Sequence, residues 1–268
     1  MAARGGKRRE ARYVDLFCGV GGFRLAVEGA CGENSVGARC VFSCDIDPDC
    51  RRAYESNFGE APHGDISAKT PSDIPDHDIL LAGFPCQPFS ILGKRRGFDD
   101  TRGTLFFEIA KILAEKRPPC FVLENVKLLA AHDGGRTFAR ILGVLGELGY
   151  RVHHRVLNAL DFGLPQKRER VFLVGFRDEA DFEWPEGGLR MTPLEEILEP
   201  SVHKKHYVSA RIRGKRLAEN EPTPFASIWH ENKSGDVSVR PYSCALRASA
   251  SHNYLLVNGE RRLTPREM

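Results

Sequence analysis

The sequence predicts an α/β fold in which a mainly parallel sheet, with helices on both faces, is followed by a smaller, mostly β segment. Between residues 13 and 176, short apolar runs typical of strands alternate with segments of helical periodicity. This alternation is typical of parallel sheets, because their strands are joined by helices. After about residue 177 the alternation stops, and prolines, glycines, basic residues and short strand-like pieces continue to residue 257. We therefore expect two domains.

The N-terminal part of the chain supplies two strand–helix pairs. Residues 13–17 are expected to form the first strand, and residues 23–29 a helix after a glycine-rich turn. Residues 39–44 are expected to form the second strand. Pro48 begins the next helix, which ends near residue 58, because proline is tolerated in the first helical turn.

The rest of the sheet follows the same pattern. Apolar runs predict strands at 79–82, 120–123, 151–157 and 171–176. Helices are expected at 104–116 and 135–149, and the first of these has its large apolar residues on one face.

Composition and charge exclude some classes of protein. The chain has 268 residues, 41% of them hydrophobic, and a net charge of +3, which neither requires nor excludes nucleic acid. No apolar run is long enough to span a membrane, and no apolar stretch follows the basic N-terminus, so a secretory signal is not expected. Eight cysteines without a signal peptide indicate a reducing cytoplasm. Cys40, Cys44 and Cys50 lack the paired spacing of a zinc site, and no metal is expected.

The first candidate site is the glycine-rich turn after the first strand, at Gly19, Gly21 and Gly22. Glycines let the backbone approach a ligand at the start of a helix. The dinucleotide-binding pattern requires a third glycine where this chain has Arg24, which argues against a nicotinamide dehydrogenase.

Acidic residues near this turn indicate the kind of cofactor. Asp45 follows the second strand, where such folds hold ribose hydroxyls, and Asp65 follows the next turn. These acids and the glycine turn suit a cofactor with adenosine but no pyrophosphate. S-adenosylmethionine fits, because its sulfonium and ammonium are positive and Asp15 is close by. Helix or turn capping is the alternative role for Asp45 and Asp65.

The second candidate site is centred on Cys86. This thiol follows the strand at 79–82, and Pro85 and Pro88 stiffen the turn around it. Open α/β sheets place their chemistry at the carboxyl ends of strands, which favours a functional thiol. A free cysteine packed in the core is the alternative.

Polar residues near two later strands complete this second site. Glu124 follows the strand at 120–123, where a partly desolvated carboxylate can act as a proton donor. Alternation places Gln166, Arg168 and Arg170 on one face. Two arginines there can hold a carboxylate, a phosphate or a base carbonyl, and a solvated basic loop is the alternative.

Together these pieces resemble the cytosine-C5 DNA methyltransferase family, and in particular its bacterial restriction-modification members. The matching segments, in order, are 15–23, Asp45, 64–66, 83–90, 102–107, 124–126, 166–170 and 262–267. The resemblance implies a Rossmann-like, S-adenosylmethionine-dependent methyltransferase fold. It also implies a catalytic and cofactor-binding domain at 13–176, a target-recognition domain at 177–257, and a truncated return segment at 258–268. The basic composition of residues 1–12 separately predicts a disordered tail.

The resemblance assigns four catalytic residues. Cys86 would add to C6 of a cytosine flipped out of duplex DNA, so that C5 accepts a methyl group from S-adenosylmethionine. Glu124 would protonate N3 of the base. Arg168 would orient the base and Glu124, while Arg170 would steady the cysteine region and the O2 side of the base.

The resemblance also assigns binding residues. Cofactor contacts are expected from Asp15, Phe17, Gly19, Gly21, Gly22, Asp45, Ile46, Asp65, Ile66, Pro85 and Leu105. Of these, Phe17 would lie at the methionine end, Asp45 at the ribose, Ile46 and Ile66 on the adenine, and Asp65 at its amino group. DNA contacts are expected from Gln87, Ser90, Lys94, Arg95, Arg96, Gln166, Arg240 and Arg247, with further candidates at Arg211, Arg213, Lys215, Arg216, His230, Asn232 and Lys233.

The end of the sequence sets a further expectation. Family members continue past the position of Met268 with a helix and a Gly-Asn motif that close the cofactor pocket. We therefore expect this chain alone to bind S-adenosylmethionine poorly, and a second polypeptide is one source of the missing segment. The alternatives are a catalytically incomplete DNA-binding fragment and a tRNA cytosine-C5 methyltransferase. The expected location is the bacterial cytoplasm, in association with the nucleoid.

Overall fold

The computed structural model describes residues 10–34, 36–85, 105–246 and 253–268. It divides into two compact units. Unit 1 comprises Met1–Val156 and Arg170–Glu183, and unit 2 comprises Leu157–Glu169 and Trp184–Met268. Residues 157–169 thus belong to unit 2, although the sequence placed them in the first domain, and residues 258–268 also belong to unit 2. The expected N-terminal tail lies mostly outside the described residues.

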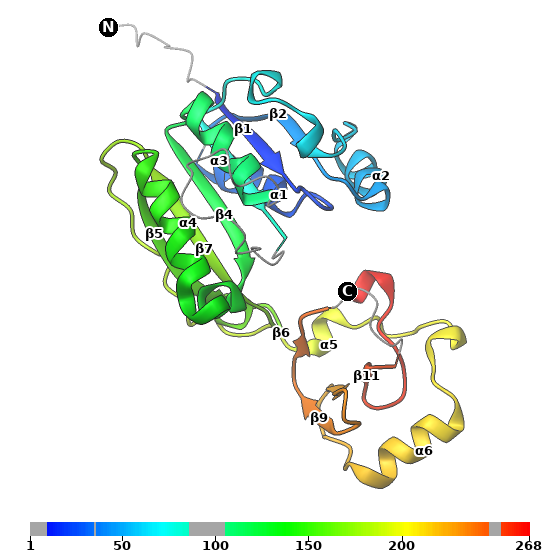
Figure 1. Ribbon diagram of the computed structural model, residues 1–268. Helices are drawn as coiled ribbons and strands as arrows, with labels where there is room; N and C mark the ends of the chain where they lie inside the picture. The colour runs from blue at the N-terminus through cyan, green and yellow to red at the C-terminus, as the bar shows by residue number, and fades with distance from the viewer. Residues whose placement is uncertain (1–9, 35, 86–104, 247–252) are drawn as a thin grey trace, which may run out of the picture. The chain divides into compact units, whose positions relative to one another are not determined.

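Unit 1 is built on a six-stranded sheet (Figure 1). In spatial order its strands are β2 (Ala38–Cys44), β1 (Ala11–Leu16), β3 (Ile79–Gly83), β4 (Cys120–Val126), β7 (Glu169–Phe176) and β5 (Arg151–Asn158). β1 pairs in parallel with β2 and β3, and β3 pairs in parallel with β4, whereas β7 runs antiparallel to β4. The predicted mainly parallel α/β sheet is confirmed.

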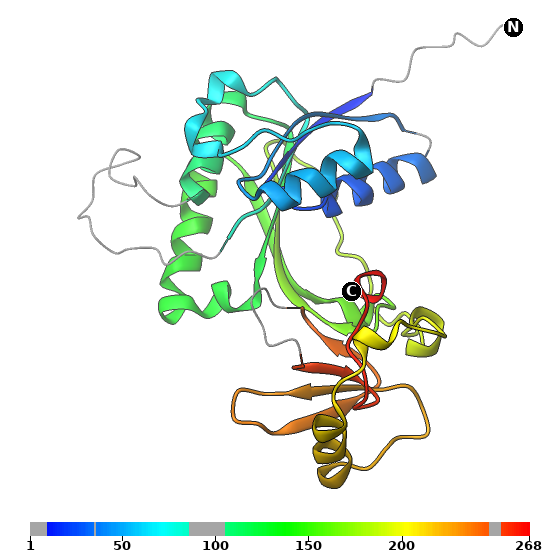
Figure 2. The same cartoon turned by 90° about the vertical axis from the view of Figure 1, so that its right-hand side faces the viewer.

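In the part of unit 1 that the structure describes, α-helices cover both faces of this sheet (Figure 2). One face carries α1 (Gly22–Glu33) and α2 (Pro48–Phe58), and the other carries α3 (Leu105–Lys116) and α4 (Arg136–Glu147). The chain moves outward from β1 to β2 and then to a parallel bridge between Cys44 and His63, before it returns to β3. Because crossovers between parallel strands are right-handed, this reversal moves the later helices to the opposite face.

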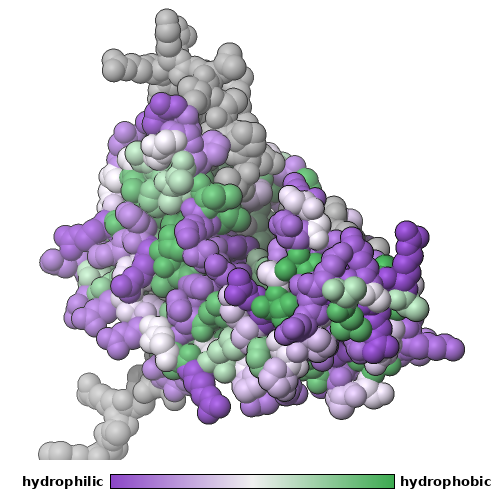
Figure 3. All heavy atoms as spheres, turned by 90° about the horizontal axis from the view of Figure 1, so that it is seen from below, coloured by the Kyte–Doolittle hydropathy of each residue, from purple (hydrophilic) through white to green (hydrophobic). Residues whose placement is uncertain are grey.

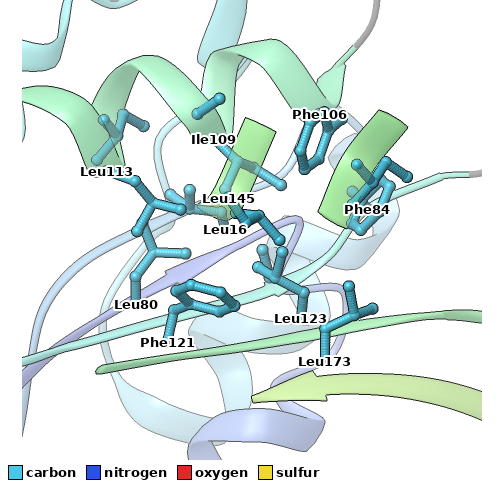
Figure 4. Packing of buried hydrophobic residues seen from close by; sticks show 14 of the residues in the cluster. Leu16, Leu80, Phe84, Phe106, Ile109, Leu113, Phe121, Leu123, Leu145 and Leu173 are labelled. Carbon is cyan, nitrogen blue, oxygen red and sulfur yellow. The ribbon is translucent and has the colours of Figure 1, made fainter. Parts of the chain in front are cut away.

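The main core lies between the sheet and α3 and α4 (Figure 4). Leu80, Phe121 and Leu123 project from the strands toward Ile109 and Leu113 of α3, and all five are fully buried. Burying large apolar side chains in this way stabilises each by roughly 1.5–3 kcal/mol, which holds the carboxyl ends of β1, β3 and β4 at one edge.

Unit 2 is smaller and mostly β. Its antiparallel sheet has the order β11 (Leu255–Val257), β8 (Ile228–Glu231) and β9 (Val237–Arg240), and β6 (Gln166–Lys167) pairs in parallel with β10 (Ser243–Cys244). Its helices are α5 (Leu194–Ile197) and α6 (Ala210–Glu219). Leu194, Ile228, Leu255 and Val257 form a small core. On the face seen in Figure 3, hydrophilic and hydrophobic residues are mixed.

Short 3-10 helices connect the main elements of both units. They are η1 (Ile66–Ala68), η2 (Pro71–Asp73), η4 (Lys127–Gly135), η5 (Ala159–Asp161), η6 (Lys204–His206) and η7 (Pro265–Glu267). Among the described residues, no helix combines the length and apolar character needed to cross a membrane.

Two boundaries differ from the sequence prediction in ways that affect the site. β4 continues through Val126, so Glu124 lies inside a strand and not after it. It continues because β7 pairs with it along its whole length, as far as the Val126–Arg170 pair. Helix α1 is also longer than expected, and begins at Gly22 directly after the glycine turn.

Candidate active site

The glycine turn after β1 has a backbone that most residues avoid. Phe17, Gly19 and Gly21 have φ angles of 56°, 54° and 97°, and Gly21 is the N-cap of α1. A Cβ at Gly19 or Gly22 would meet nothing within 4 Å, so there is open space beside the turn. The turn therefore exposes backbone at the start of a helix, where a ligand can approach closely.

Asp45 connects this turn to the end of β2. Its Oδ2 accepts a hydrogen bond from the backbone N–H of Gly19 at 2.8 Å, and its Oδ1 accepts one from the N–H of Asp47 at 2.8 Å. Asp47 in turn caps α2. The structure thus brings Asp45 together with the glycine turn, as the expected cofactor site requires.

Asp65 has the capping role that the sequence left as the alternative. It is exposed and caps η1, and its Oδ1 accepts hydrogen bonds from the N–H of Ser67 at 2.9 Å and from the Ser67 hydroxyl at 2.6 Å. These hydrogen bonds, the hydroxyl first, lower the pKa of Asp65. A second role at an adenine amino group is compatible with this exposure.

Asp15 lies inside β1 and is fully buried. Neither carboxylate oxygen has a hydrogen-bond partner. Burial raises the pKa of Asp15 to about 7, while the charge of Arg24 lowers it and that of Asp45 raises it further. A buried carboxylate without a partner is costly, and it creates a site that favours a nearby cation.

The apolar residues expected around a cofactor differ in exposure. Ile46 is 70% exposed, and Pro85 is exposed at the end of the described segment after β3. Phe17 and Leu105 are partly buried against the main core. Ile66 is only 4% exposed and belongs to that core, so much of its surface is already packed.

Glu124 and Arg170 form an ion pair at the carboxyl end of β4. The Nε of Arg170 lies 2.8 Å from Oε1 of Glu124, and both side chains are mostly buried. They meet because Val126 pairs with Arg170 in the antiparallel register, which places Glu124 and Arg170 diagonally on one face. Cys86 itself lies outside the described residues, but Gly83, which pairs with Glu124, is three residues before it.

Alternation was expected to place Gln166, Arg168 and Arg170 on one face, but the three residues do not belong to one continuous strand. Gln166 belongs to β6, which pairs with β10, whereas Arg170 belongs to β7. Arg168 lies between these strands, where its backbone N–H donates to the Asn158 side-chain oxygen at 3.1 Å. The chain changes pairing partner between β6 and β7, so simple alternation does not apply across the break.

Asn125 is a site residue that the sequence reasoning missed. It is 1% exposed, and its side-chain nitrogen donates to the backbone oxygen of Phe84 at 2.8 Å. The bond ties the end of β4 to the residues just after β3. A polar residue directly after Glu124, at the end of an apolar strand, was the available signal.

Only some of the expected DNA contacts can be placed. Gln87, Ser90, Lys94, Arg95, Arg96 and Arg247 lie outside the described residues. Arg240 is exposed at the end of β9, and Arg211 and Lys215 are exposed on α6.

Two other candidates on α6 have partners within unit 2. Arg213 pairs with Glu260, and Arg216 is 5% exposed and pairs with Glu231. Arg216 is therefore a buried structural residue, which corrects its expected place on a DNA-binding surface.

The sheet and the turn after β1 define the class of protein. The strand order, with an antiparallel β7 between β4 and β5, is that of a Rossmann-like S-adenosylmethionine-dependent methyltransferase. The residues present fit this cofactor, because the glycine turn has open space beside it and the unpartnered carboxylate of Asp15 lies just before it.

The chain belongs to the C-5 cytosine-specific DNA methylase family, whose model matches residues 11–240. It is 57% identical over 260 residues to the Type II methyltransferase M.NgoBI of Neisseria gonorrhoeae, a match that covers 96% of this chain and 80% of the relative. It is 54% identical over 263 residues to the Type II methyltransferase M.HaeII of Haemophilus aegyptius, a match that covers 97% of this chain and 81% of that relative. The resemblance identified from the motifs is confirmed, and S-adenosylmethionine is the methyl donor.

Solved structures share the fold. The Entamoeba histolytica methyltransferase EhMeth has a TM-score of 0.68 at 16% identity, with 97% of this chain and 84% of that chain covered. The S. pombe Dnmt2 methyltransferase has a TM-score of 0.66 at 20% identity, with 96% and 85% covered. At such identities the likeness concerns the fold alone.

Proposed function

We propose that this chain methylates C5 of a cytosine flipped out of duplex DNA, with Cys86 as nucleophile and Glu124, Arg168 and Arg170 around the base. The observation that carries the proposal is the Glu124–Arg170 ion pair. It lies at the end of β4 beside the end of β3, the strand that leads to Cys86.

The chemistry explains why these residue types are needed. C5 of cytosine is a weak nucleophile, and addition of the Cys86 thiolate to C6 makes C5 enamine-like. Glu124 gives a proton to N3, so that negative charge does not accumulate on the ring. Arg170 holds Glu124 in place, and Arg168 orients the base.

When bound, S-adenosylmethionine supplies the methyl group that C5 accepts. A base then removes the C5 proton, and the electron pair of the C5–H bond forms the C5=C6 double bond. The bond between Cys86 and C6 breaks, the thiolate leaves with the bonding electrons, and N3 returns its proton to Glu124. On the protein side, the glycine turn, Asp45 and Ile46 hold the cofactor beside the base. The exposure of Ile46 and the contact between Asp45 and Gly19 support this assignment.

The relatives suggest the biological setting. M.NgoBI and M.HaeII are named Type II methyltransferases, which supports a role in a restriction-modification system. We place the chain in the bacterial cytoplasm at the nucleoid, with duplex DNA as partner and exposed cations such as Arg240 on phosphates.

A covalent trap tests the proposal. The purified chain is incubated with S-adenosylmethionine and duplex fragments in which every cytosine is 5-fluorocytosine, since these contain any recognition sequence. The fluorine cannot leave as a proton does, so the Cys86–C6 bond should persist and give a slowly migrating band on a denaturing gel. C86S should give none.

The controls separate the alternatives. A catalytically incomplete DNA-binding fragment would shift the duplex on a native gel without forming the adduct. Transfer to tRNA but not to duplex DNA, measured with labelled methyl groups, would instead support a tRNA methyltransferase. If the wild-type chain forms no adduct, even when co-expressed with a C-terminal polypeptide, the proposed function is wrong.

A further inference from the structure

Arg24 is a buried arginine at the position where a dinucleotide-binding protein has a glycine. It is 8% exposed and lies in the first turn of α1. Its Nε lies 2.8 Å from Oε1 of Glu28, and its Nη1 lies 3.2 Å from Oε2 of Glu60 and 3.4 Å from the Tyr54 hydroxyl. Burial of a guanidinium is costly, and these partners from α1, from α2 and from just beyond α2 compensate for it.

The guanidinium also stacks on an aromatic side chain of α2. Cζ of Arg24 lies 4.4 Å from the centre of the Phe58 ring, a cation–π contact, and the Phe58 ring packs on that of Tyr54 with 4.6 Å between centroids. A lysine cannot reproduce this geometry, because only the planar guanidinium stacks while its separate nitrogens reach two carboxylates.

Phe58 also packs against the glycine turn. Its ring lies directly against Gly21, so closely that a Cβ on Gly21 would overlap ring atoms. The side-chain nitrogen of Asn57, also on α2, donates to the backbone oxygen of Val20 at 3.3 Å. Two neighbouring residues of α2 therefore fix two neighbouring residues of the turn.

Hydrogen bonds within the glycine turn also hold the backbone of the proposed cofactor site. The N–H of Gly21 donates to the oxygen of Cys18 at 2.9 Å, and the N–H of Gly19 donates to Asp45 at 2.8 Å. A continuous series of contacts thus runs from Arg24 through Phe58 and Gly21 to Gly19 and Asp45.

We propose that Arg24 is a positioning residue for S-adenosylmethionine: by locking α1 to α2 through Phe58, it holds the glycine turn and Asp45 in the geometry that binds the cofactor. The inference rests on the proposed function, since it concerns the same cofactor site. Arg24 acts in this proposal through its contacts with α1 and α2, so its loss should weaken cofactor binding and leave the chemical step intact.

Two substitutions and one matched control test this. R24M keeps an apolar stem but removes the charge and the stacking, and R24K keeps the charge alone. Arg52, on the same helix as Phe58, is 71% exposed and pairs with the exposed Asp49, so R52M removes an arginine of α2 without touching the contacts of Arg24. All assays run below the unfolding temperature of each variant.

The first measurement is cofactor affinity. For R24M we expect the dissociation constant and the KM for S-adenosylmethionine to rise at least tenfold, while kcat at saturating cofactor and the KM for DNA change less than threefold. R24K should recover part of the affinity, and R52M should match the wild type. A purely structural role predicts a lower unfolding temperature with unchanged affinity, and that result would overturn the proposal.

The second measurement does not depend on activity. Amide hydrogen exchange of the cofactor-free chain should speed up at least tenfold in residues 19–23 and 45–47 of R24M, and not in R52M. Failure of the wild-type chain to bind S-adenosylmethionine would bear on the proposed function and not on Arg24, for which the exchange experiment still decides. Unchanged exchange in R24M would refute the positioning role whatever the chain binds.

Discussion

Arg170 holds Glu124 through a 2.8 Å contact between Nε and Oε1, across the antiparallel strands β7 and β4. This pairing joins two residues that are far apart in the chain and that the proposed mechanism needs at the same base. It also shows that the carboxylate is not a loose strand-end group, because the neighbouring strand fixes its position.

The first prediction concerns this pair. E124Q should reduce methyl transfer by about 10²–10⁴-fold, because the amide cannot give a proton to N3. R170K should reduce it roughly tenfold, since lysine lacks the planar contact. The measurement is incorporation of labelled methyl groups into DNA. The matched control is R151Q in β5, which breaks the exposed Arg151–Glu179 pair and should change the rate less than twofold.

The second prediction concerns pH and the buried Asp15. Burial raises its pKa from 3.8 to about 7 in the folded chain. Between those values the folded state binds more protons than the unfolded state, so Asp15 lowers stability increasingly as pH rises from about 4 to 7. D15N removes this effect. The free energy of unfolding of D15N, relative to that of the wild type, should therefore increase as the pH rises from about 4 to 7. The increase should reach up to roughly 4 kcal/mol and level off above pH 7.

Urea unfolding at several pH values measures this difference. The control is D76N, since the Asp76 side chain is 85% exposed and its substitution should change the free energy of unfolding only slightly. A D15N curve that runs parallel to the wild type from pH 4 to 7 would contradict the assignment.

The third prediction concerns Glu267 in unit 2. Burial alone would raise its pKa, but hydrogen bonds from Arg261 and from the backbone of Thr264 and Glu199 outweigh it and lower the pKa to about 2. The ionised Glu267 therefore stabilises the folded chain fully above about pH 4.5, and this stabilisation is lost as the pH falls toward 2. E267Q should destabilise the chain by roughly 3 kcal/mol at pH 7, because it leaves Arg261 without its carboxylate partner.

The difference in the free energy of unfolding between E267Q and the wild type should become smaller as the pH falls below 4.5. Tryptophan fluorescence can follow unfolding of unit 2, because Trp184 and Trp229 both belong to it. E221Q, at an exposed glutamate of the same unit, should leave the free energy of unfolding close to that of the wild type. If this difference instead became larger at lower pH, the stabilisation assigned to the ionised Glu267 would be wrong.

The fourth prediction compares Gly21, the N-cap of α1, with Gly29 inside the same helix. G21A should destabilise the chain by more than about 1 kcal/mol, because Gly21 has a φ of 97° and an added Cβ would overlap the Phe58 ring. G29A, where a Cβ meets nothing within 4 Å, should stabilise it by about 0.5–1 kcal/mol. Thermal unfolding gives both values, and equal effects at the two positions would contradict the packing described for Gly21.

The fifth prediction concerns Asn125. N125A leaves the buried oxygen of Phe84 without its donor, which should cost about 1–3 kcal/mol and release the residues that lead toward Cys86. Methyl transfer should fall further than stability alone explains. N34A removes a similar 2.8 Å bond from an exposed amide to the Ala30 oxygen, and should cost less than about 1 kcal/mol. Full activity in N125A would exclude a role for this bond in the site.

Much of the fold was predictable because periodicity encodes it locally. The strands at 79–82 and 171–176 and the helix at 48–58 agree with β3, β7 and α2 within a few residues. The prediction failed where a neighbouring strand decided the outcome. Glu124 became part of β4 through pairing with β7, and the break between β6 and β7 separates Gln166 from Arg170.

The candidate site was predictable in type but not in detail. The sequence by itself determined the α/β class, the family and the methyl donor, because ordered motifs and their residue types are local properties of the chain. Only the tertiary structure decided that Arg170 binds Glu124, that Asp15 is buried without a hydrogen-bond partner, and that Arg216 is a structural residue. The physical reason is that burial and ion pairing depend on strand register and helix packing, which bring together side chains that are distant in the sequence.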